Sequence, residues 1–353
     1  MKFSNFLFPE SRAKENDFTI IDDALKEARL CDELGYDAVW LAEHHFDGGC
    51  AYVEPCTFAA AIAAQTSQIK IGFAVAQMAI HHPVRLAEEV ALIDNISQGR
   101  MLLGVGRGTA FNFYEYRGFG IDPAEAQERF LESEEILFKI WTSNNYKHEG
   151  KYWNFSLPEL RPDVYQKPYP PIIRACSSID STLEMARAGR PFMMNIQDDK
   201  TTIDRFSQFR NVMAESGYDE ERIEQTVENS WVWRNIFVAE TDVEAERIGA
   251  AAFTSMREYL NGNRHKLNTA EEMARVTAGP AAARNDLDRG MIYGSPATVA
   301  EKLKPLQKAN IGGIIIHFRL GPMTWEDVEN SLTLFAQKVV PEFKTAQVIK
   351  QRK

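Results

Sequence analysis

The sequence has little of several features that mark large classes of proteins. It has four cysteines in 353 residues and no CxxC pair; they are Cys31, Cys50, Cys56 and Cys176. So few cysteines cannot build a disulfide framework, and we expect reduced thiols. No run of about 18 apolar residues is present, so we expect no membrane span. The segment Met1–Glu10 lacks the basic region and long apolar stretch of a signal peptide, so the cytoplasm is the expected compartment.

Basic residues are also too few for a nucleic-acid-binding surface. The formal net charge is −10, and no Lys/Arg-rich run interrupts the chain. We therefore expect no nucleic-acid partner. The hydrophobic fraction of 44% is that of an ordinary globular protein with a sizeable core. The length fits one large α/β barrel, so residues 1–353 are expected to form a single domain.

Short apolar runs alternate with amphipathic stretches along the whole chain, which is the pattern of a parallel α/β fold. We expect strands at Lys2–Phe8, Asp37–Ala42, Lys70–Gln77, Arg100–Gly106, Pro171–Ala175, Phe192–Ile196, Trp231–Val238 and Gly312–Phe318. We expect helices at Asp22–Leu34, Pro55–Thr66, Pro83–Ile96, Pro123–Trp141, Ser181–Ala188, Thr202–Ser216, Asp242–Tyr259, Ala297–Ala309 and Trp325–Phe343.

Eight strands, each followed by a helix, predict a (β/α)8 TIM barrel. The rival fold, a doubly wound sheet, carries a Gly-rich nucleotide turn after its first strand, and Phe8–Arg12 contains no glycine. Two segments interrupt the repeat. Residues 144–171 predict a hairpin or an irregular insertion. Residues 261–290 are polar and Ala-rich, and a segment of that kind predicts a mobile lid over the barrel mouth.

Polar residues gather where several predicted strands end. Glu43 and His44 follow the second strand, His81 and His82 the third, Arg107 the fourth, and Ser178 and Ser181 the fifth. In an α/β barrel the reacting groups lie at the carboxyl ends of the strands. We therefore expect these side chains to share one end of the barrel.

Arg107, Ser178 and Ser181 together predict an anion site. Arg107 lies between glycines, which let a ligand approach the backbone, and a guanidinium binds phosphate through two parallel hydrogen bonds. Ser178 and Ser181 stand where a helix begins, and free N–H groups there favour an anion. Two plainer interpretations stay open: Ser178 is an ordinary N-cap, and Arg107 pairs with an acidic neighbour.

The histidines indicate acid–base chemistry. His44 would titrate near neutral pH, and alternation along extended backbone should turn His44 toward the barrel axis and His45 away, or the reverse. Alternatively, either ring only caps the strand end. His82, before a proline, is expected to be a structural turn residue. Adjacent His pairs lack the spacing of HxH or HExxH, so we expect no metal.

Four segments resemble the luciferase-like monooxygenase family, and most closely its bacterial luciferase α-subunit branch. They are Ala42–Phe46 (AEHHF), His82–Arg85 (HPVR), Asp94 with Ser97–Arg100 (SQGR), and Gly104–Gly108 (GVGRG). The similarity runs from the first strand to the last helix. It implies a TIM barrel, usually dimeric, that takes reduced FMN from a separate flavin reductase and uses O2 to oxygenate an organic substrate.

The resemblance also implies roles for single residues. Arg107, Ser178 and Ser181 match the positions that bind the FMN phosphate. Glu43 and His44 match a polar pair beside the flavin and the substrate, with His44 as acid/base and Glu43 as its orienting partner. Ala74 and Val75 match the place of a non-prolyl cis peptide under the flavin ring, and residues 261–290 match a loop that closes over the site.

Two departures bear on the substrate. Gly106 stands where the luciferase branch places a cysteine, and Thr109–Gly120 is more aromatic. We therefore expect a lipophilic aldehyde, ketone or cyclic or aromatic compound rather than light emission from a fatty aldehyde. The expected protein is a homodimeric, FMN-dependent two-component monooxygenase. The alternatives are a deazaflavin-dependent hydride-transfer oxidoreductase and a non-catalytic flavin-binding relative.

Overall fold

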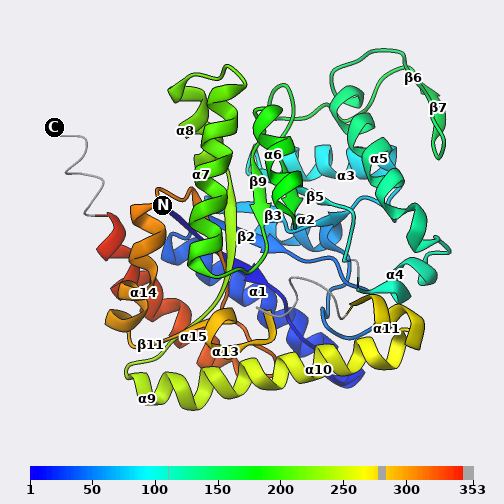
Figure 1. Cartoon of the computed structure of the whole chain (residues 1–353). Coiled ribbons are helices and arrows are strands. Elements are labelled where there is room, and N and C mark those ends of the chain that lie inside the picture. Colours follow the sequence, from blue (N-terminus) through cyan, green and yellow to red (C-terminus); the bar gives the residue numbers. More distant parts are fainter. Residues whose placement is uncertain (110, 277–283, 345–353) are drawn as a thin grey trace.

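A closed barrel of parallel strands forms the framework of the computed structural model, which describes residues 1–109, 111–276 and 284–344. In barrel order the strands are β1 (Lys2–Leu7), β2 (Ala38–Leu41), β3 (Lys70–Phe73), β5 (Met101–Gly106), β8 (Ile172–Cys176), β9 (Phe192–Met194), β10 (Trp231–Val238) and β12 (Gly313–His317). Pairing of β12 with β1 and of β9 with β10 closes the ring. The predicted TIM barrel and its eight strands are confirmed (Figure 1).

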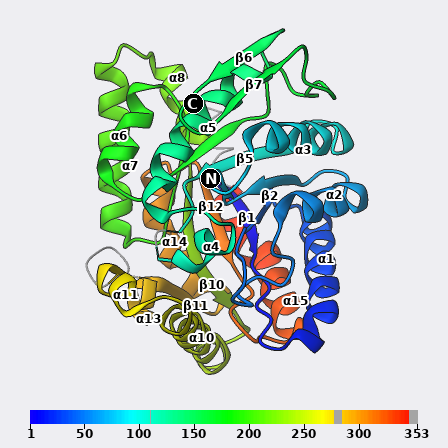
Figure 2. The same ribbon diagram turned by 90° about the vertical axis from the view of Figure 1, so that its right-hand side faces the viewer.

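Helices surround the barrel (Figures 1 and 2). They include α1 (Asp17–Leu34), α2 (Pro55–Gln65), α3 (Pro83–Ile96), α5 (Ala126–Ile140), α6 (Ile179–Arg187), α7 (Asp199–Glu215), α9 (Asp242–Ala245), α10 (Ala251–Leu267), α14 (Pro296–Lys308) and α15 (Trp325–Leu334). Helix α3 begins and ends at the predicted residues. Its Pro83 has no N–H to leave unpaired at the first turn, and Leu86, Val90 and Ile93 bury one face.

The sequence did not reveal several shorter elements. These are α4 (Phe113–Gly118), α8 (Glu220–Glu228) and β11 (Met291–Gly294), which extends the sheet beside the second half of β10. The strand predicted at Lys70–Gln77 is present as β3 and, after a break, β4 (Ala76–Gln77). Short elements leave too few residues for a clear hydrophobic period. Helix α4 matters most, because it supplies a residue of the candidate site.

Aromatic rings fill the barrel interior. The rings of Trp40 and Trp231 meet edge to face at 5.1 Å, and Trp40 Nε1 donates to Ser4 Oγ. A Cβ at Gly72 would lie 2.3 Å from the Trp40 ring, so only glycine fits there. Toward the carboxyl ends of the strands, Phe8 contacts the ring of His44 at 5.5 Å and that of His317 at 5.7 Å. These three rings mark the mouth of the barrel.

The two predicted interruptions differ in outcome. Residues 144–171 do contain a hairpin, made by β6 (Tyr146–Glu149) and β7 (Asn154–Leu157), which Figure 2 shows projecting from the barrel. The expectation of an irregular segment over 261–290 is wrong for its described parts. Helix α10 runs to Leu267, and α11 (Ala270–Val276) and α13 (Leu287–Gly290) follow. Lys, Leu, Glu, Met and Arg favour helix, and Thr269 and Glu272 form a capping box at the start of α11, in which Glu272 N donates to Thr269 Oγ1 and Thr269 N donates to Glu272 Oε2. Residues 277–283 of the predicted lid lie outside the described residues.

Two expectations about cysteine and membranes can be compared with the structure. All four cysteines are free and buried, as predicted. Within the described ranges, no helix combines the length and apolar character needed to cross a bilayer.

Candidate active site

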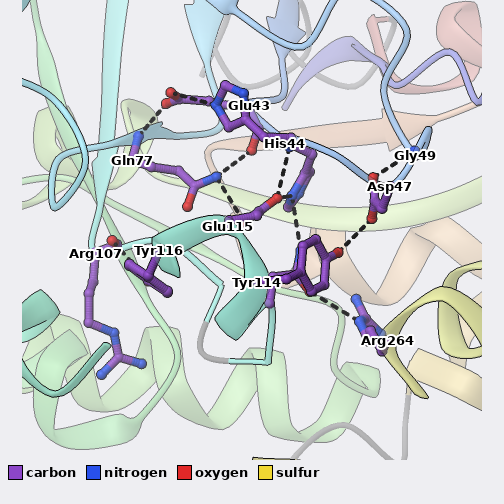
Figure 3. Close-up of polar contacts among 12 residues, drawn as sticks. Glu43, His44, Asp47, Gly49, Gln77, Arg107, Tyr114, Glu115, Tyr116 and Arg264 are labelled. Atoms are coloured by element: carbon purple, nitrogen blue, oxygen red, sulfur yellow. Dashed lines mark hydrogen bonds and ion pairs between the residues drawn. The ribbon is translucent and has the colours of Figure 1, made fainter. Parts of the chain in front are cut away.

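His44 lies on the loop after β2, at the mouth of the barrel. Its Nδ1 is 2.9 Å from Glu115 Oε1 and 3.3 Å from Asn112 Nδ2 (Figure 3). Its Nε2 forms no hydrogen bond with the residues that the structure describes. Burial would lower the pKa of His44, but the Glu115 carboxylate outweighs it and raises the pKa above the usual value. A neutral His44 that donates from Nδ1 to Glu115 leaves Nε2 as a free base.

Glu115 is the orienting partner of His44, which corrects the prediction that Glu43 has this role. It lies on α4, fully buried, and also accepts from His45 N at 3.0 Å and from Gln77 Nε2 at 3.2 Å. Burial opposes its ionisation, but His44 and these donors lower its pKa below the usual range. The single acid within the aromatic run 113–116 was a signal, yet no local pattern pairs it with a residue 71 positions away.

Glu43 instead holds neighbouring loops together. Its Oε1 lies 2.7 Å from His81 Nε2 and 3.2 Å from His45 Nε2, and its Oε2 accepts from Gln77 N at 2.6 Å. Burial would raise the pKa of Glu43, but these partners lower it to about 2. Glu43 is therefore an ionised carboxylate behind His44. The alternation predicted for the histidine pair is also seen, since His45 packs on Phe119 and His44 on Phe8.

His82 has the structural role expected of it. It precedes Pro83 as the N-cap residue of α3, without a side-chain cap hydrogen bond. Its ring packs against Trp153 at 4.6 Å.

Arg107 follows β5, and the residue is partly buried. It forms no ion pair with the described residues, and every Asp and Glu of the chain is among them. The Arg107 side chain interacts with the Tyr116 hydroxyl, which carries no charge to neutralise it. The alternative that Arg107 pairs with an acidic neighbour is therefore wrong. Figure 3 shows the guanidinium pointing away from Glu43 and His44. The Arg107 carbonyl accepts from Tyr116 OH at 3.3 Å, which fixes the backbone at this turn.

Ser178 and Ser181 begin helix α6 in a capping box. Ser178 Oγ accepts from Ser181 N at 3.2 Å, and the two hydroxyl oxygens are 3.0 Å apart. The N-cap interpretation of Ser178 is thus confirmed, and it does not exclude an anion at the same helix end. Strand β5 pairs with β8 in a register that puts Val105 opposite Arg174. Arg107 and Ser178 therefore leave neighbouring strands at the same end of the barrel.

The peptide bond between Ala74 and Val75 is cis, as the family resemblance implied. A Cβ at Gly106 would lie 2.8 Å from Val75 Cγ2. The Val75 side chain therefore explains why glycine rather than cysteine precedes Arg107.

Several polar atoms near the mouth are buried without a partner among the described residues. They are Gln77 Oε1, Trp233 Nε1, His317 Nε2 and Arg205 Nη1. Burial lowers the pKa of His317 to about 3, so this histidine is neutral. Burial also lowers the pKa of Arg205, which lies on α7. Arg205 is within electrostatic reach of Cys176, and the Cys176 Sγ is 3.3 Å from the Ser181 carbonyl oxygen. Sequence patterns gave no reason to select Arg205, because it occupies an amphipathic helix.

No group of three or more His, Cys, Asp or Glu side chains that could hold a metal ion occurs in the part of the chain that the structure describes. The polar groups at the mouth instead suit an organic ligand with a planar polar ring and a phosphate. Arg107 is a cation without an anionic partner among the described residues.

The family model described as luciferase-like monooxygenase matches residues 1–311. The oxygenase component of the flavin-dependent trigonelline monooxygenase of Acinetobacter baylyi is 25% identical over 363 residues, which cover 99% of this chain and 97% of that protein. An uncharacterised protein of Sinorhizobium fredii is 32% identical over 191 residues, or 54% of this chain and 53% of that protein, and a second one matches similarly. The chain therefore spans about half the length of these two relatives.

Among solved structures, monooxygenase RslO1 from Streptomyces bottropensis superposes with a TM-score of 0.82 at 27% identity, covering 97% of this chain and 100% of that one. Two more distant structures share the fold. One is the oxygenating constituent of a Pseudomonas putida 3,6-diketocamphane monooxygenase in complex with FMN, at a TM-score of 0.78, 23% identity and coverage of 97% and 98%. The other is an F420-dependent secondary alcohol dehydrogenase, at a TM-score of 0.73, 16% identity and the same coverage. Flavins of both kinds are thus bound by this fold.

Similarity to the luciferase α-subunit branch is less specific than the sequence motifs suggested. The alkanal monooxygenase α chain of Photorhabdus luminescens is 28% identical, but over 62% of this chain and 60% of that protein. The trigonelline enzyme aligns over almost all of the chain. The comparisons therefore do not single out the α-subunit branch.

Proposed function

The chain belongs to the luciferase-like monooxygenase family, and we propose that it is the oxygenase of a two-component system. In this proposal it takes reduced FMN from a separate flavin reductase and uses O2 to oxygenate an organic substrate with an apolar body. Bound reduced FMN would supply the electrons that activate O2. The chain itself binds, orients and shields the reactants and moves protons.

The unpaired guanidinium of Arg107 carries this proposal. Arg107 is partly buried and has no carboxylate partner, and such a cation is costly unless a ligand neutralises it. Its natural ligand is an anion, and the first turn of α6 at the same barrel end offers free N–H groups and the Ser178 and Ser181 hydroxyls. We propose that Arg107, Ser178 and Ser181 bind the FMN phosphate. Ala74 and Val75 would lie under the flavin ring.

His44 would act as the acid/base. Its Nε2 is free, and Nδ1 is held by Glu115 at 2.9 Å, which fixes the tautomer and stabilises the protonated ring. The raised pKa keeps His44 able to hold a proton near neutral pH. Glu43 would act as a positioning residue, since its carboxylate binds His45, His81 and the Gln77 backbone N–H. The side chain of Gln77 in turn donates to the Glu115 carboxylate.

The proposal also includes a homodimer and a transient encounter with the reductase. The FMN choice is supported by the FMN complex of the 3,6-diketocamphane enzyme and by the name of the flavin-dependent trigonelline enzyme.

The direct test of activity is a turnover assay with ¹⁸O2. The protein, FMN, NADH and a general flavin reductase are mixed with a panel of aldehydes, ketones and cyclic compounds, and products are analysed by mass spectrometry. We expect a product that contains one ¹⁸O atom and that forms only with FMN and O2. Anaerobic bleaching of oxidised F420 with an alcohol panel would instead show hydride transfer. Flavin binding without any product would show a non-catalytic relative.

A further inference from the structure

Three arginines near the barrel mouth form no ion pair with the described residues, although the more distant carboxylates of Asp47 and Glu115 act on one of them, Arg264. Arg257 and Arg264 lie on α10, and Arg284 lies shortly before α13. The segments outside the description, residues 110, 277–283 and 345–353, contain no Asp or Glu.

Neutral amides orient two of these guanidinium groups without neutralising them. Arg257 donates from Nε and Nη2 to Asn285 Oδ1, at 2.9 and 2.7 Å. Arg264 donates from Nε to Asn112 Oδ1 and from Nη1 to Asn261 Oδ1, both at 3.2 Å. A guanidinium has five N–H donors, so several remain available to a ligand.

The three charges also act on one another. Burial, together with the charges of Arg264 and Arg284, lowers the pKa of Arg257 to about 9. Burial and Arg264 lower the pKa of Arg284 to about 10. Like charges gathered in a half-buried place destabilise a fold, and such arrangements are typical of binding sites. The chain as a whole has a net charge of −10, so the positive charge of these three arginines is local to this place.

The arginine cluster belongs to the same mouth as His44. Asn112 connects them, since its Oδ1 accepts from Arg264 and its Nδ2 lies 3.3 Å from His44 Nδ1. The charge of Arg257 likewise acts on His317. Figure 3 shows Arg264 beside Tyr114 and Asp47, apart from Arg107. The proposed cofactor anion and the arginine cluster thus occupy different parts of the mouth.

We propose that Arg257, Arg264 and Arg284 bind a carboxylate of the organic substrate and hold that substrate beside His44. This inference rests on the proposed function, in which Arg107 already accounts for the cofactor phosphate. A planar carboxylate suits guanidinium groups because it accepts parallel hydrogen bonds. The Phe111 ring, 6.0 Å from the Arg264 guanidinium, offers an apolar surface next to the charge. The substrate class is therefore a ring-containing carboxylic acid rather than a neutral lipophilic compound.

Calorimetric titration of the flavin-free protein tests this assignment separately from flavin chemistry. The probes are benzoate and cyclohexanecarboxylate, each compared with its primary amide. We expect the carboxylates to bind and the amides to bind at least tenfold more weakly. Arg257→Gln and Arg284→Gln should each weaken carboxylate binding roughly tenfold or more, because each removes a charge-assisted hydrogen bond. Arg257→Lys should restore part of the affinity.

Arg275→Gln is the matched control, since Arg275 on α11 is exposed and paired with Glu271. It should leave carboxylate binding unchanged. The inference is overturned if neither carboxylate binds, if the amides bind equally well, or if the Gln variants bind carboxylates like the wild type.

A parallel anaerobic titration with reduced FMN separates this inference from the proposed function. Unchanged FMN affinity in Arg257→Gln and Arg284→Gln supports a substrate site. A large loss of FMN affinity in these variants would assign the cluster to the cofactor and overturn the inference. If the wild type binds carboxylates but not reduced FMN, the proposed function fails while the anion site stands.

Discussion

His44 Nδ1 lies 2.9 Å from Glu115 Oε1, and this contact joins the loop after β2 to a short helix 71 positions later in the chain. A second carboxylate, Glu43, lies one residue before His44 and binds His81 and His45 instead. Gln77 touches both carboxylates, through its backbone N–H to Glu43 and its side chain to Glu115. The two acids therefore have separate tasks: Glu115 sets the state of His44, and Glu43 supports the surrounding loops.

Glu115→Gln should lower the pKa of His44, because the substitution removes the negative charge that raises it. Histidine NMR titration measures this pKa directly. Glu43→Gln is the control and should move the pKa of His81 more than that of His44, since Glu43 raises the His81 pKa. If Glu43→Gln changed the pKa of His44 more than Glu115→Gln does, the assignment of partners would be contradicted.

The same ion pair should give a definite pH dependence of stability. His44 binds its proton more tightly in the folded chain than in the unfolded chain. Its contribution to the free energy of unfolding is therefore fully present below the unfolded histidine pKa and is lost as the pH rises through the folded value. Denaturant unfolding of wild type and Glu115→Gln between pH 5 and 8 measures this contribution, because that range spans the usual histidine pKa of about 6.5. A difference between the two proteins that grew with rising pH would contradict the pairing.

His317 should oppose stability in acid. Its pKa of about 3 means that the folded chain keeps it neutral while the unfolded chain protonates it near pH 6.5. Its share of the stability is present above the unfolded pKa and is lost as the pH falls toward 3. His317→Phe keeps a ring against Phe6 and Phe8. As the pH falls through this window, its free energy of unfolding should decrease by up to about 1.4 kcal/mol less per pH unit than that of the wild type. Equal pH slopes for both proteins would show that His317 is already protonated in the fold.

Gly72→Ala should destabilise the barrel core. The new Cβ would lie 2.3 Å from the Trp40 ring, and overpacking of this kind costs about 1–3 kcal/mol. Gly262→Ala is the matched control, because, apart from the adjacent residues and the backbone of α10 itself, no atom of the described residues lies within 4 Å of its Cβ position. That control should be neutral or stabilising by about 0.5–1 kcal/mol, as alanine favours helix. Chemical denaturation distinguishes the two, and equal stability of both variants would contradict the packing described.

The barrel could be predicted from the sequence because its strands and helices bury continuous apolar faces. Helix α3 shows this most clearly, since Pro83 and Ser97 bound a face with helical spacing. The segment after α10 could not be predicted in the same way. Its polar residues form no amphipathic stripe, so the sequence predicts an irregular segment where the structure has the helix α11.

The candidate site was predictable only where chemistry is local. Arg107 between glycines and Ser178 before a helix are visible in a few consecutive residues. The Glu115 contact with His44 and the grouping of Arg257 with Arg284 depend on tertiary packing. The residues around Glu115 do not indicate which histidine it contacts, and Glu43 is the acid nearest to His44 in the sequence. Local proximity therefore gave the wrong partner.

The most direct test of the central claim compares the binding of reduced FMN with that of reduced riboflavin, which lacks the phosphate, under anaerobic conditions. Wild type should bind FMN at least tenfold more tightly than riboflavin, because charge-assisted hydrogen bonds reach the phosphate. Arg107→Ala should lose most of this preference while keeping its riboflavin affinity. Equal affinities for both flavins in the wild type, or an unchanged preference in Arg107→Ala, would contradict a phosphate site formed by Arg107 and the start of α6.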